Sequence, residues 1–134
     1  PSVSFNLRHG GALLIDRKNP KKAIQSIQEF GKRLTENKHS AVIFPEGTRS
    51  RDGKIKPFQK AGLATLLKHM PDALVVPVSI GNSWRFAEHK YFPMPLGVPL
   101  KIKVHPALEI IPGENEKLFE TIETIVGKGV KTLQ

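Results

Sequence analysis

Apolar positions in the first third of the chain predict a helix followed by a strand. Residues Ala23, Ile24, Ile27, Phe30 and Leu34 recur at helical spacing and give one apolar face. Asn19-Pro20 before them is typical of a helix start, because asparagine caps and proline suits the first helical position. We expect the helix to end near Asn37 and a short buried strand to occupy Ala41–Phe44.

The middle of the chain repeats this order. The segment Pro57–Gly62 leads into a second predicted helix that ends at about His69, before the helix-breaking Pro71. Leu74–Ile80 is rich in β-branched residues and is predicted to be a strand. Pro77 lies inside it and cannot donate to a ladder, so an edge position or a bulge is expected there.

The last third predicts a loop, a strand and a helix. Prolines, glycines and aromatic residues between Gly81 and Pro99 indicate a long loop. Leu100–Val104 alternates apolar and basic residues, which is typical of a half-exposed strand. Pro112–Asn115 opens a last helix that carries apolar residues on one side. Alternation of helices and strands predicts an α/β fold with a mixed β-sheet flanked by helices, in a single domain over residues 1–134.

Composition narrows the possible functions. The 134 residues include no cysteine, which excludes disulfides and thiolate metal sites, and no His, Asp or Glu cluster has metal-ligand spacing, so no metal is expected. Apolar runs such as Ala73–Ile80 are too short to cross a bilayer. The chain opens at Pro1 without a signal-peptide pattern, and we expect it to be part of a longer protein.

Positive charge is concentrated in the first half of the chain. Residues 1–70 hold 14 Lys and Arg against 5 Asp and Glu, whereas residues 71–134 hold 7 against 7, so the net charge of +9 lies in the first part. Such a field attracts phosphates on a metabolite, a nucleic acid or an anionic membrane. The alternative is a solvated basic surface that aids solubility.

The segment Phe44–Ser50, called the signature loop below, carries the most specific chemistry. It follows the predicted strand, and ligands of open α/β sheets bind at the carboxyl ends of strands. Arg49 can hold phosphate oxygens through two parallel hydrogen bonds, and Gly47 lets the backbone approach a ligand. Thr48 offers a hydroxyl donor, and Glu46 can accept from a substrate hydroxyl or orient the arginine. Alternatively, Glu46 and Arg49 merely pair on the surface.

The signature loop resembles that of the glycerolipid acyltransferases, the 1-acyl-glycerol-3-phosphate (lysophosphatidic acid) acyltransferase family. Three further segments resemble motifs of that family in the family's order, and they are Gly11–Arg17, Pro57–Gly62 and Val75–Ile80. The four motifs together cover most of residues 10–80, and the part beyond residue 85 matches only loosely. The resemblance implies a glycerol-3-phosphate acyltransferase-like fold, of which this chain is the C-terminal portion, incomplete at the N-terminus.

The resemblance also implies roles for individual residues. Binding of the acceptor phosphate falls to Arg17, Glu46, Gly47, Thr48, Arg49 and Lys60. Val76, Pro77 and Val78 support the site or contact the acyl donor. Simpler interpretations are a surface arginine at Arg17, an ordinary helix-start lysine at Lys60 and a purely architectural Pro77.

The family's catalytic pair is missing from this sequence. The resemblance implies a histidine as general base on the acceptor hydroxyl, with an aspartate five positions later that orients it. The five histidines are followed at that spacing by Leu14, Phe44, Leu74, Met94 and Ile110. No catalytic residue is therefore assigned in this chain, the pair is expected upstream of Pro1, and the 134 residues alone are predicted to be inactive.

The function implied is transfer of a fatty acyl group from acyl-CoA or acyl-carrier protein to the free hydroxyl of 1-acyl-glycerol-3-phosphate, in phospholipid biosynthesis. The expected partners are the lysophospholipid, the acyl donor and a membrane surface, reached at its cytoplasmic face through a segment outside this chain; no cofactor is expected. The loop Trp84–Leu100 either faces membrane or acyl chain, or packs over the core. A rival function is a non-catalytic basic domain that binds anionic partners such as nucleic acid, although no helix carries a dense Lys and Arg stripe.

Overall fold

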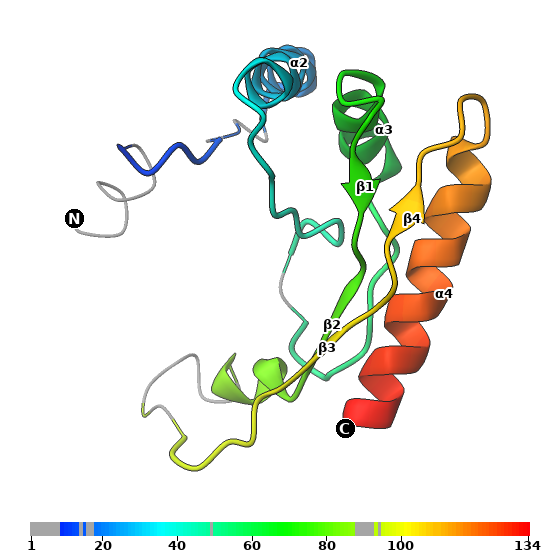
Figure 1. Cartoon of the computed structure of the whole chain (residues 1–134). Coiled ribbons are helices and arrows are strands. Elements are labelled where there is room, and N and C mark those ends of the chain that lie inside the picture. Colours follow the sequence, from blue (N-terminus) through cyan, green and yellow to red (C-terminus); the bar gives the residue numbers. More distant parts are fainter. Residues whose placement is uncertain (1–8, 14, 16–17, 49, 88–92, 94) are drawn as a thin grey trace. The chain divides into compact units, whose positions relative to one another are not determined.

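The computed structural model describes residues 9–13, 15, 18–48, 50–87, 93 and 95–134 (Figure 1). The elements, in chain order, are helices α2 (Pro20–Glu36) and α3 (Lys60–Lys68), strands β1 (Leu74–Val75) and β2 (Val78–Gly81), the 3₁₀ helix η1 (Ser83–Ala87), strands β3 (Lys101–Val104) and β4 (Leu108–Glu109), and helix α4 (Asn115–Leu133). They form two compact units. The first extends to Ile43 and includes Ala61–Pro71, and the second comprises Phe44–Lys60 and Asp72–Gln134.

Helix α2 begins and ends where the sequence predicts. The Asn19 side-chain oxygen accepts a hydrogen bond from the Lys22 N–H at 3.1 Å, and Pro20 occupies the start of the helix. At the other end Asn37 donates through its side chain to the Arg33 carbonyl at 2.7 Å. Both ends are thus capped by short-range contacts that the sequence itself encodes.

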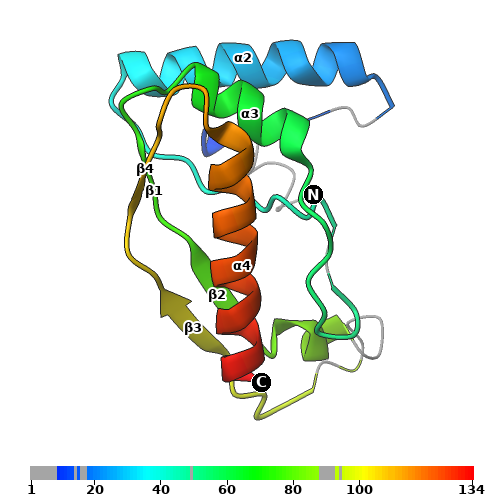
Figure 2. The ribbon, with the colours of Figure 1, turned by 90° about the vertical axis from the view of Figure 1, so that its right-hand side faces the viewer.

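Helices α2 and α3 pack together within the first unit (Figure 2). A Cβ built on Gly31 would lie 3.0 Å from the His69 Cβ and 3.3 Å from a Leu66 methyl, so glycine permits this close approach. Thr35 adds a hydrogen bond of 2.8 Å from its hydroxyl to the His69 carbonyl. The buried apolar side chains of this unit are Leu34, Leu63, Leu66 and Leu67.

The predicted strand Leu74–Ile80 is interrupted at Val76-Pro77. Before the interruption β1 pairs antiparallel with β4, and after it β2 pairs antiparallel with β3. Pro77 has no N–H for a ladder, but its carbonyl accepts the His105 N–H at 3.0 Å. The expected irregularity at Pro77 is confirmed, and β4 is a strand that the sequence pattern did not predict.

Helix α4 lies along one face of strand β2 (Figure 2). Ser79 is fully buried and faces Gly129, and Gly81 faces Leu133, so small residues let helix and strand approach closely. Phe119 of α4, only 1% exposed, and the neighbouring Ile122 contribute to the core of this unit.

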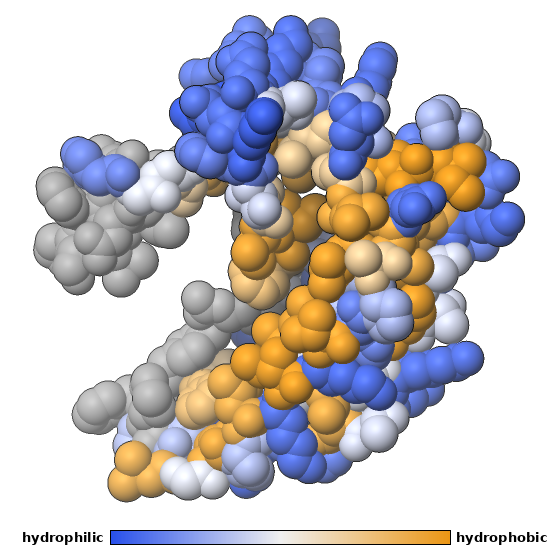
Figure 3. Space-filling model, in the orientation of Figure 1, coloured by the Kyte–Doolittle hydropathy of each residue, from blue (hydrophilic) through white to orange (hydrophobic). Residues whose placement is uncertain are grey.

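The opposite face of these strands is apolar and exposed, as Figure 3 shows. Successive side chains of a strand alternate between faces, so Val78 points away from the face on which Ser79 meets α4. Its cross-strand partner Val104 lies on the same outer face. We call this surface the outer apolar strip, and its exposed residues are Leu74, Val76, Val78, Leu100, Ile102 and Val104.

Two predictions about strands were wrong. Ala41–Phe44 forms no strand, and Val42 and Phe44 are 85% and 74% exposed, because no strand pairs with this segment in the described part of the chain. Strand β3 is exposed along its whole length instead of half-exposed, because its apolar side chains belong to the outer apolar strip.

The loop between β2 and β3 is tied at its two ends. The buried Asn82 donates through its side-chain amide to the Pro99 carbonyl at 2.9 Å. Within it Trp84 is half-buried, whereas Leu96 is 97% exposed, so the described part of Trp84–Leu100 both packs inward and projects outward. No helix among the described residues is long and apolar enough to span a membrane.

Candidate anion-binding site

The signature loop makes a tight turn around its glycine. The Gly47 N–H donates to the Phe44 carbonyl at 3.1 Å, and Gly47 adopts a φ of 66°. Residues other than glycine rarely adopt this backbone conformation, so the turn explains why a glycine occupies position 47. Thr48, which follows, is exposed.

Two hydrogen bonds connect the signature loop to the segment that precedes α3. The Gln59 N–H donates to the Pro45 carbonyl at 2.7 Å. The Lys56 N–H donates to Oε2 of the Glu46 carboxylate at 2.9 Å. We call the stretch from Glu46 to Lys56 the closed loop, because these bonds bring its two ends together.

The far end of this closed loop is ordered by Asp52. Its Oδ1 accepts from the Lys54 N–H at 3.1 Å and from the Ser50 hydroxyl at 3.2 Å. These donors, first the Lys54 N–H, favour the charged carboxylate and hold the pKa of Asp52 below its ordinary value of 3.8. The next residue, Gly53, accepts at its carbonyl from the Gln134 side chain at 2.6 Å.

Lys60, a predicted phosphate ligand, is the first residue of α3 and follows Gln59 directly. Its Nζ lies 2.7 Å from Oε2 of Glu116 in the first turn of α4. The hydrogen bond that Lys60 donates to the Glu116 carboxylate favours the charged ammonium and raises the pKa of Lys60 above its ordinary value of 10.5. The two side chains remain 41% and 73% exposed, so solvent weakens the pair and an anion can reach the lysine.

The structure brings four of the predicted phosphate-binding residues into one compact unit, and they are Glu46, Gly47, Thr48 and Lys60. Arg17 and Arg49 lie outside the described residues. Of the residues assigned to support or donor binding, Pro77 is buried at the interruption between β1 and β2. Val76 and Val78 are exposed on the outer apolar strip.

Sequence reasoning missed the partners of two of these residues. Nothing in the local pattern indicates that Lys56 donates to Glu46, ten positions earlier, or that Glu116 pairs with Lys60, 56 positions earlier. The hydrogen bond from the Lys54 N–H to Asp52 is a contact that the sequence does indicate. Ser50–Lys54 has the composition of a turn, and aspartate in such turns accepts from the backbone N–H two residues later.

A second cluster of polar residues lies at the contact between β2 and α4. The Ser79 hydroxyl lies 2.8 Å from Nε2 of His105 and 3.1 Å from the Val126 carbonyl. Because Ser79 is fully buried, it is not placed to attack a substrate. Among the described residues no group of three or more His, Asp or Glu side chains could hold a metal ion.

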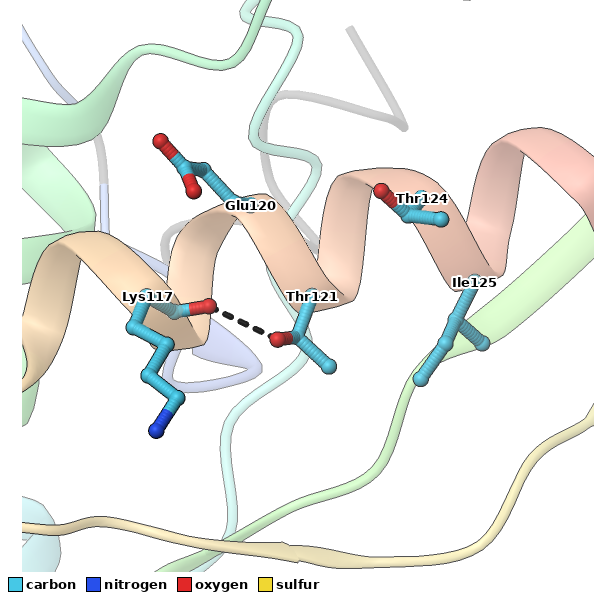
Figure 4. Close-up of a pocket in the computed structure, with 5 residues that line it drawn as sticks. All are labelled: Lys117, Glu120, Thr121, Thr124 and Ile125. Carbon is cyan, nitrogen blue, oxygen red and sulfur yellow. Dashed lines mark hydrogen bonds between the residues drawn. The ribbon is translucent and has the colours of Figure 1, made fainter.

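A hollow of about 330 Å³ lies on α4 (Figure 4). Its lining comes from one helix only, and consists of Lys117, Glu120, Thr121, Thr124 and Ile125. The Thr121 hydroxyl already donates to the Lys117 carbonyl at 2.7 Å. None of the predicted site residues lines it, so we do not assign the acceptor site to this hollow.

The comparison with protein families agrees with the four motifs. The Acyltransferase family model matches residues 1–81, more than half of the chain. The chain therefore belongs to the acyltransferase family, and the resemblance stated from its motifs is confirmed.

Named relatives make the comparison more specific. A 1-acyl-sn-glycerol-3-phosphate acyltransferase of Limnanthes douglasii is 40% identical over 120 residues, which cover 89% of this chain and 41% of the relative. A protein of the same name from Borreliella burgdorferi is 28% identical, and the match covers 100% of this chain and 53% of the relative. The chain thus spans about half the length of these relatives.

A solved structure confirms the α/β fold class. The crystal structure of PlsC, the 1-acyl-sn-glycerophosphate (LPA) acyltransferase of Thermotoga maritima, resembles this chain with a TM-score of 0.71 at 28% identity. The likeness covers 99% of this chain and 52% of that one. Helices with small antiparallel strand pairs thus form a large part of an acyltransferase fold.

Proposed function

We propose that this chain supplies the acceptor-phosphate pocket of an enzyme that transfers a fatty acyl group to the free hydroxyl of 1-acyl-glycerol-3-phosphate. The names of the relatives support this reaction and acceptor. The observation that carries the proposal is the braced signature loop, in which the turn at Gly47, before Thr48, is bonded to the segment that leads into Lys60.

In this reaction the acceptor hydroxyl oxygen attacks the thioester carbonyl of acyl-CoA or an acyl-carrier protein. A carbon–oxygen bond forms and the carbon–sulfur bond breaks, while a base takes the hydroxyl proton and passes it to the departing thiolate, which leaves as the thiol. These 134 residues hold the acceptor, and a histidine and aspartate pair elsewhere in the enzyme carries out the proton transfer. Positioning the acceptor contributes to the rate by aligning its hydroxyl with the thioester.

The proposed phosphate ligands are Arg17, Arg49 and Lys60, with the Thr48 hydroxyl and the backbone at Gly47. Guanidinium groups bind phosphate through paired, charge-assisted hydrogen bonds, which are stronger than neutral ones. Phosphorylated acceptor and lipid product both favour a membrane-associated enzyme, and we place the whole protein at the cytoplasmic face of a membrane.

The test uses full-length enzyme with Arg49→Ala. We expect the KM for 1-acyl-glycerol-3-phosphate to rise about tenfold or more, because hydrogen bonds to a charged group are lost, while the KM for the acyl donor changes little. Arg51→Ala is the matched control, since Arg51 is an exposed arginine two positions away. Equal losses for both substrates, or equal losses in both variants, would contradict the proposed pocket.

A further inference from the structure

We propose that Glu46 is a positioning residue, which closes the signature loop through the Lys56 backbone and does not bind the acceptor through its charge. This inference rests on the proposed function, since the loop that Glu46 closes is the proposed phosphate-binding loop. It changes the role that the family resemblance implies for Glu46, which was that of a member of the acceptor pocket.

The contact itself carries the first step. Oε2 of Glu46 lies 2.9 Å from the backbone nitrogen of Lys56, and Glu46 is half-buried. The segment around Lys56 is neither helix nor strand, so its backbone N–H groups depend on partners of this kind. A carboxylate that accepts a backbone N–H makes a charge-assisted hydrogen bond, which is among the stronger ones in proteins.

The second step is the anchoring of Lys56. Phe58, two residues later, is 7% exposed and is one of the buried apolar side chains of the second unit. Gln59 then binds the Pro45 carbonyl at 2.7 Å, and a Cβ on Gly47 would lie only 3.2 Å from the Gln59 Cγ. The segment that contains Lys56 is thus fixed to the core. Through its hydrogen bond to this segment, Glu46 also holds the turn at Gly47 in place.

The third step follows from chain direction. Thr48 comes two positions after Glu46, so the backbone that Glu46 fixes also sets where the Thr48 side chain begins. A carboxylate turned toward a backbone N–H is also less repulsive to a bound phosphate than one turned toward the pocket. The position of Glu46 therefore fits a brace better than an anion-binding ligand.

The two roles predict different results for Glu46→Gln. Glutamine retains an acceptor oxygen at the end of a side chain of equal length, so a brace survives while the negative charge is lost. In full-length enzyme we expect Glu46→Gln to keep kcat/KM within about threefold, since a neutral bond replaces a charge-assisted one. Glu46→Ala should raise the KM for the acceptor about tenfold or more.

Lys56 gives a matched pair of variants. Lys56→Pro removes the N–H, and Lys56→Ala keeps the N–H while removing the side chain. We expect Lys56→Pro to reproduce the raised KM of Glu46→Ala, and Lys56→Ala to have a clearly smaller effect. Equal effects of the two Lys56 variants would assign the contribution to the lysine side chain and overturn the proposal.

Hydrogen exchange measured by mass spectrometry on the same full-length variants keeps the test independent of activity. Peptides that cover residues 47–59 should exchange several-fold faster in Glu46→Ala and should remain protected in Glu46→Gln, while peptides of α4 stay unchanged. If Glu46→Gln raises the acceptor KM as much as Glu46→Ala does and the loop stays protected in both, Glu46 acts through its charge and the proposal is overturned. If Arg49→Ala leaves the acceptor KM unchanged while Glu46→Ala still loosens the loop, the phosphate pocket fails but the brace stands.

Discussion

The Ser79 hydroxyl lies 2.8 Å from Nε2 of His105 in a fully buried position between β2 and α4. The same hydroxyl lies 3.1 Å from the Val126 carbonyl, to which it donates. The Ser79 hydroxyl thus joins the His105 ring to the backbone of α4. Three separate parts of the second unit meet at one oxygen atom.

Ser79→Ala should destabilise the protein. The substitution leaves the Val126 carbonyl and the His105 ring nitrogen without this partner, and an unsatisfied buried polar group costs about 1–3 kcal/mol. Urea titration of the variant measures the free energy of unfolding. Thr124→Ala is the control, because Thr124 is exposed on α4 and its loss should change stability by no more than about 0.5 kcal/mol. Equal stability of the two variants would show that the cluster contributes little.

Two glycines of α4 should respond to alanine in opposite directions. A Cβ on Gly129 would collide with the Ser79 hydroxyl and lie 2.8 Å from Nε2 of His105, so Gly129→Ala should cost about 1–3 kcal/mol through overpacking. A Cβ on Gly127 would have its nearest neighbour, a methyl of Ile55, at 3.9 Å. Gly127→Ala should therefore stabilise the helix by about 0.5–1 kcal/mol. Thermal unfolding measures both variants. If the melting temperature changed in the same direction in both, α4 would not pack on β2 as described.

Glu116 should compete with the acceptor phosphate for Lys60. Because the two side chains are paired at 2.7 Å, Glu116→Gln frees the lysine, and we expect a few-fold lower KM for the acceptor at low ionic strength. The gain should shrink at high salt, which screens exposed charges. Glu109→Gln, an exposed carboxylate of β4, is the control for a general change in net charge. A KM that rises in Glu116→Gln would show that the pair positions Lys60 instead of masking it.

The hydrogen bonds by which Asp52 orders the closed loop should lower the pKa of the Asp52 carboxyl group. A pKa held below 3.8 means that the folded state binds the Asp52 proton less tightly than the unfolded chain does. Its contribution to stability is therefore complete well above pH 3.8 and is lost as the pH falls through the folded-state pKa. Carboxyl NMR should give a midpoint below 3.8, and Ser50→Ala should move it upward. A midpoint at or above 3.8 would mean that the Lys54 and Ser50 bonds do not form in solution.

Local features of the sequence predicted the helices well. Caps at Asn19 and Asn37 act over three or four residues, so both ends of α2 could be predicted, and the interruption at Pro77 followed from its missing N–H. The strand predicted at Ala41–Phe44 was wrong, because a strand requires a partner that an apolar run does not specify. The short strand β4 could not be predicted, because its pairing with β1 joins residues more than thirty positions apart.

The residues of the candidate site could be predicted from the sequence, but the hydrogen bonds and ion pairs that they form could not. Glu46, Gly47 and Thr48 were recognised from the motif, and the positive φ of Gly47 supplies the physical reason for its glycine. The acceptor for the Lys56 N–H and the partner of Lys60 depend on how the chain folds back, which no local pattern encodes.

The outer apolar strip has a practical consequence for binding experiments. Micelles, vesicles and free fatty acids adhere to exposed aliphatic surface whatever head group they carry. Adsorption of a lysolipid to these 134 residues would therefore reveal nothing about recognition of its phosphate. Water-soluble glycerol 3-phosphate has no acyl tail to engage Val78, Ile102 or Val104, so it is the probe with which occupancy of the signature loop can be read separately.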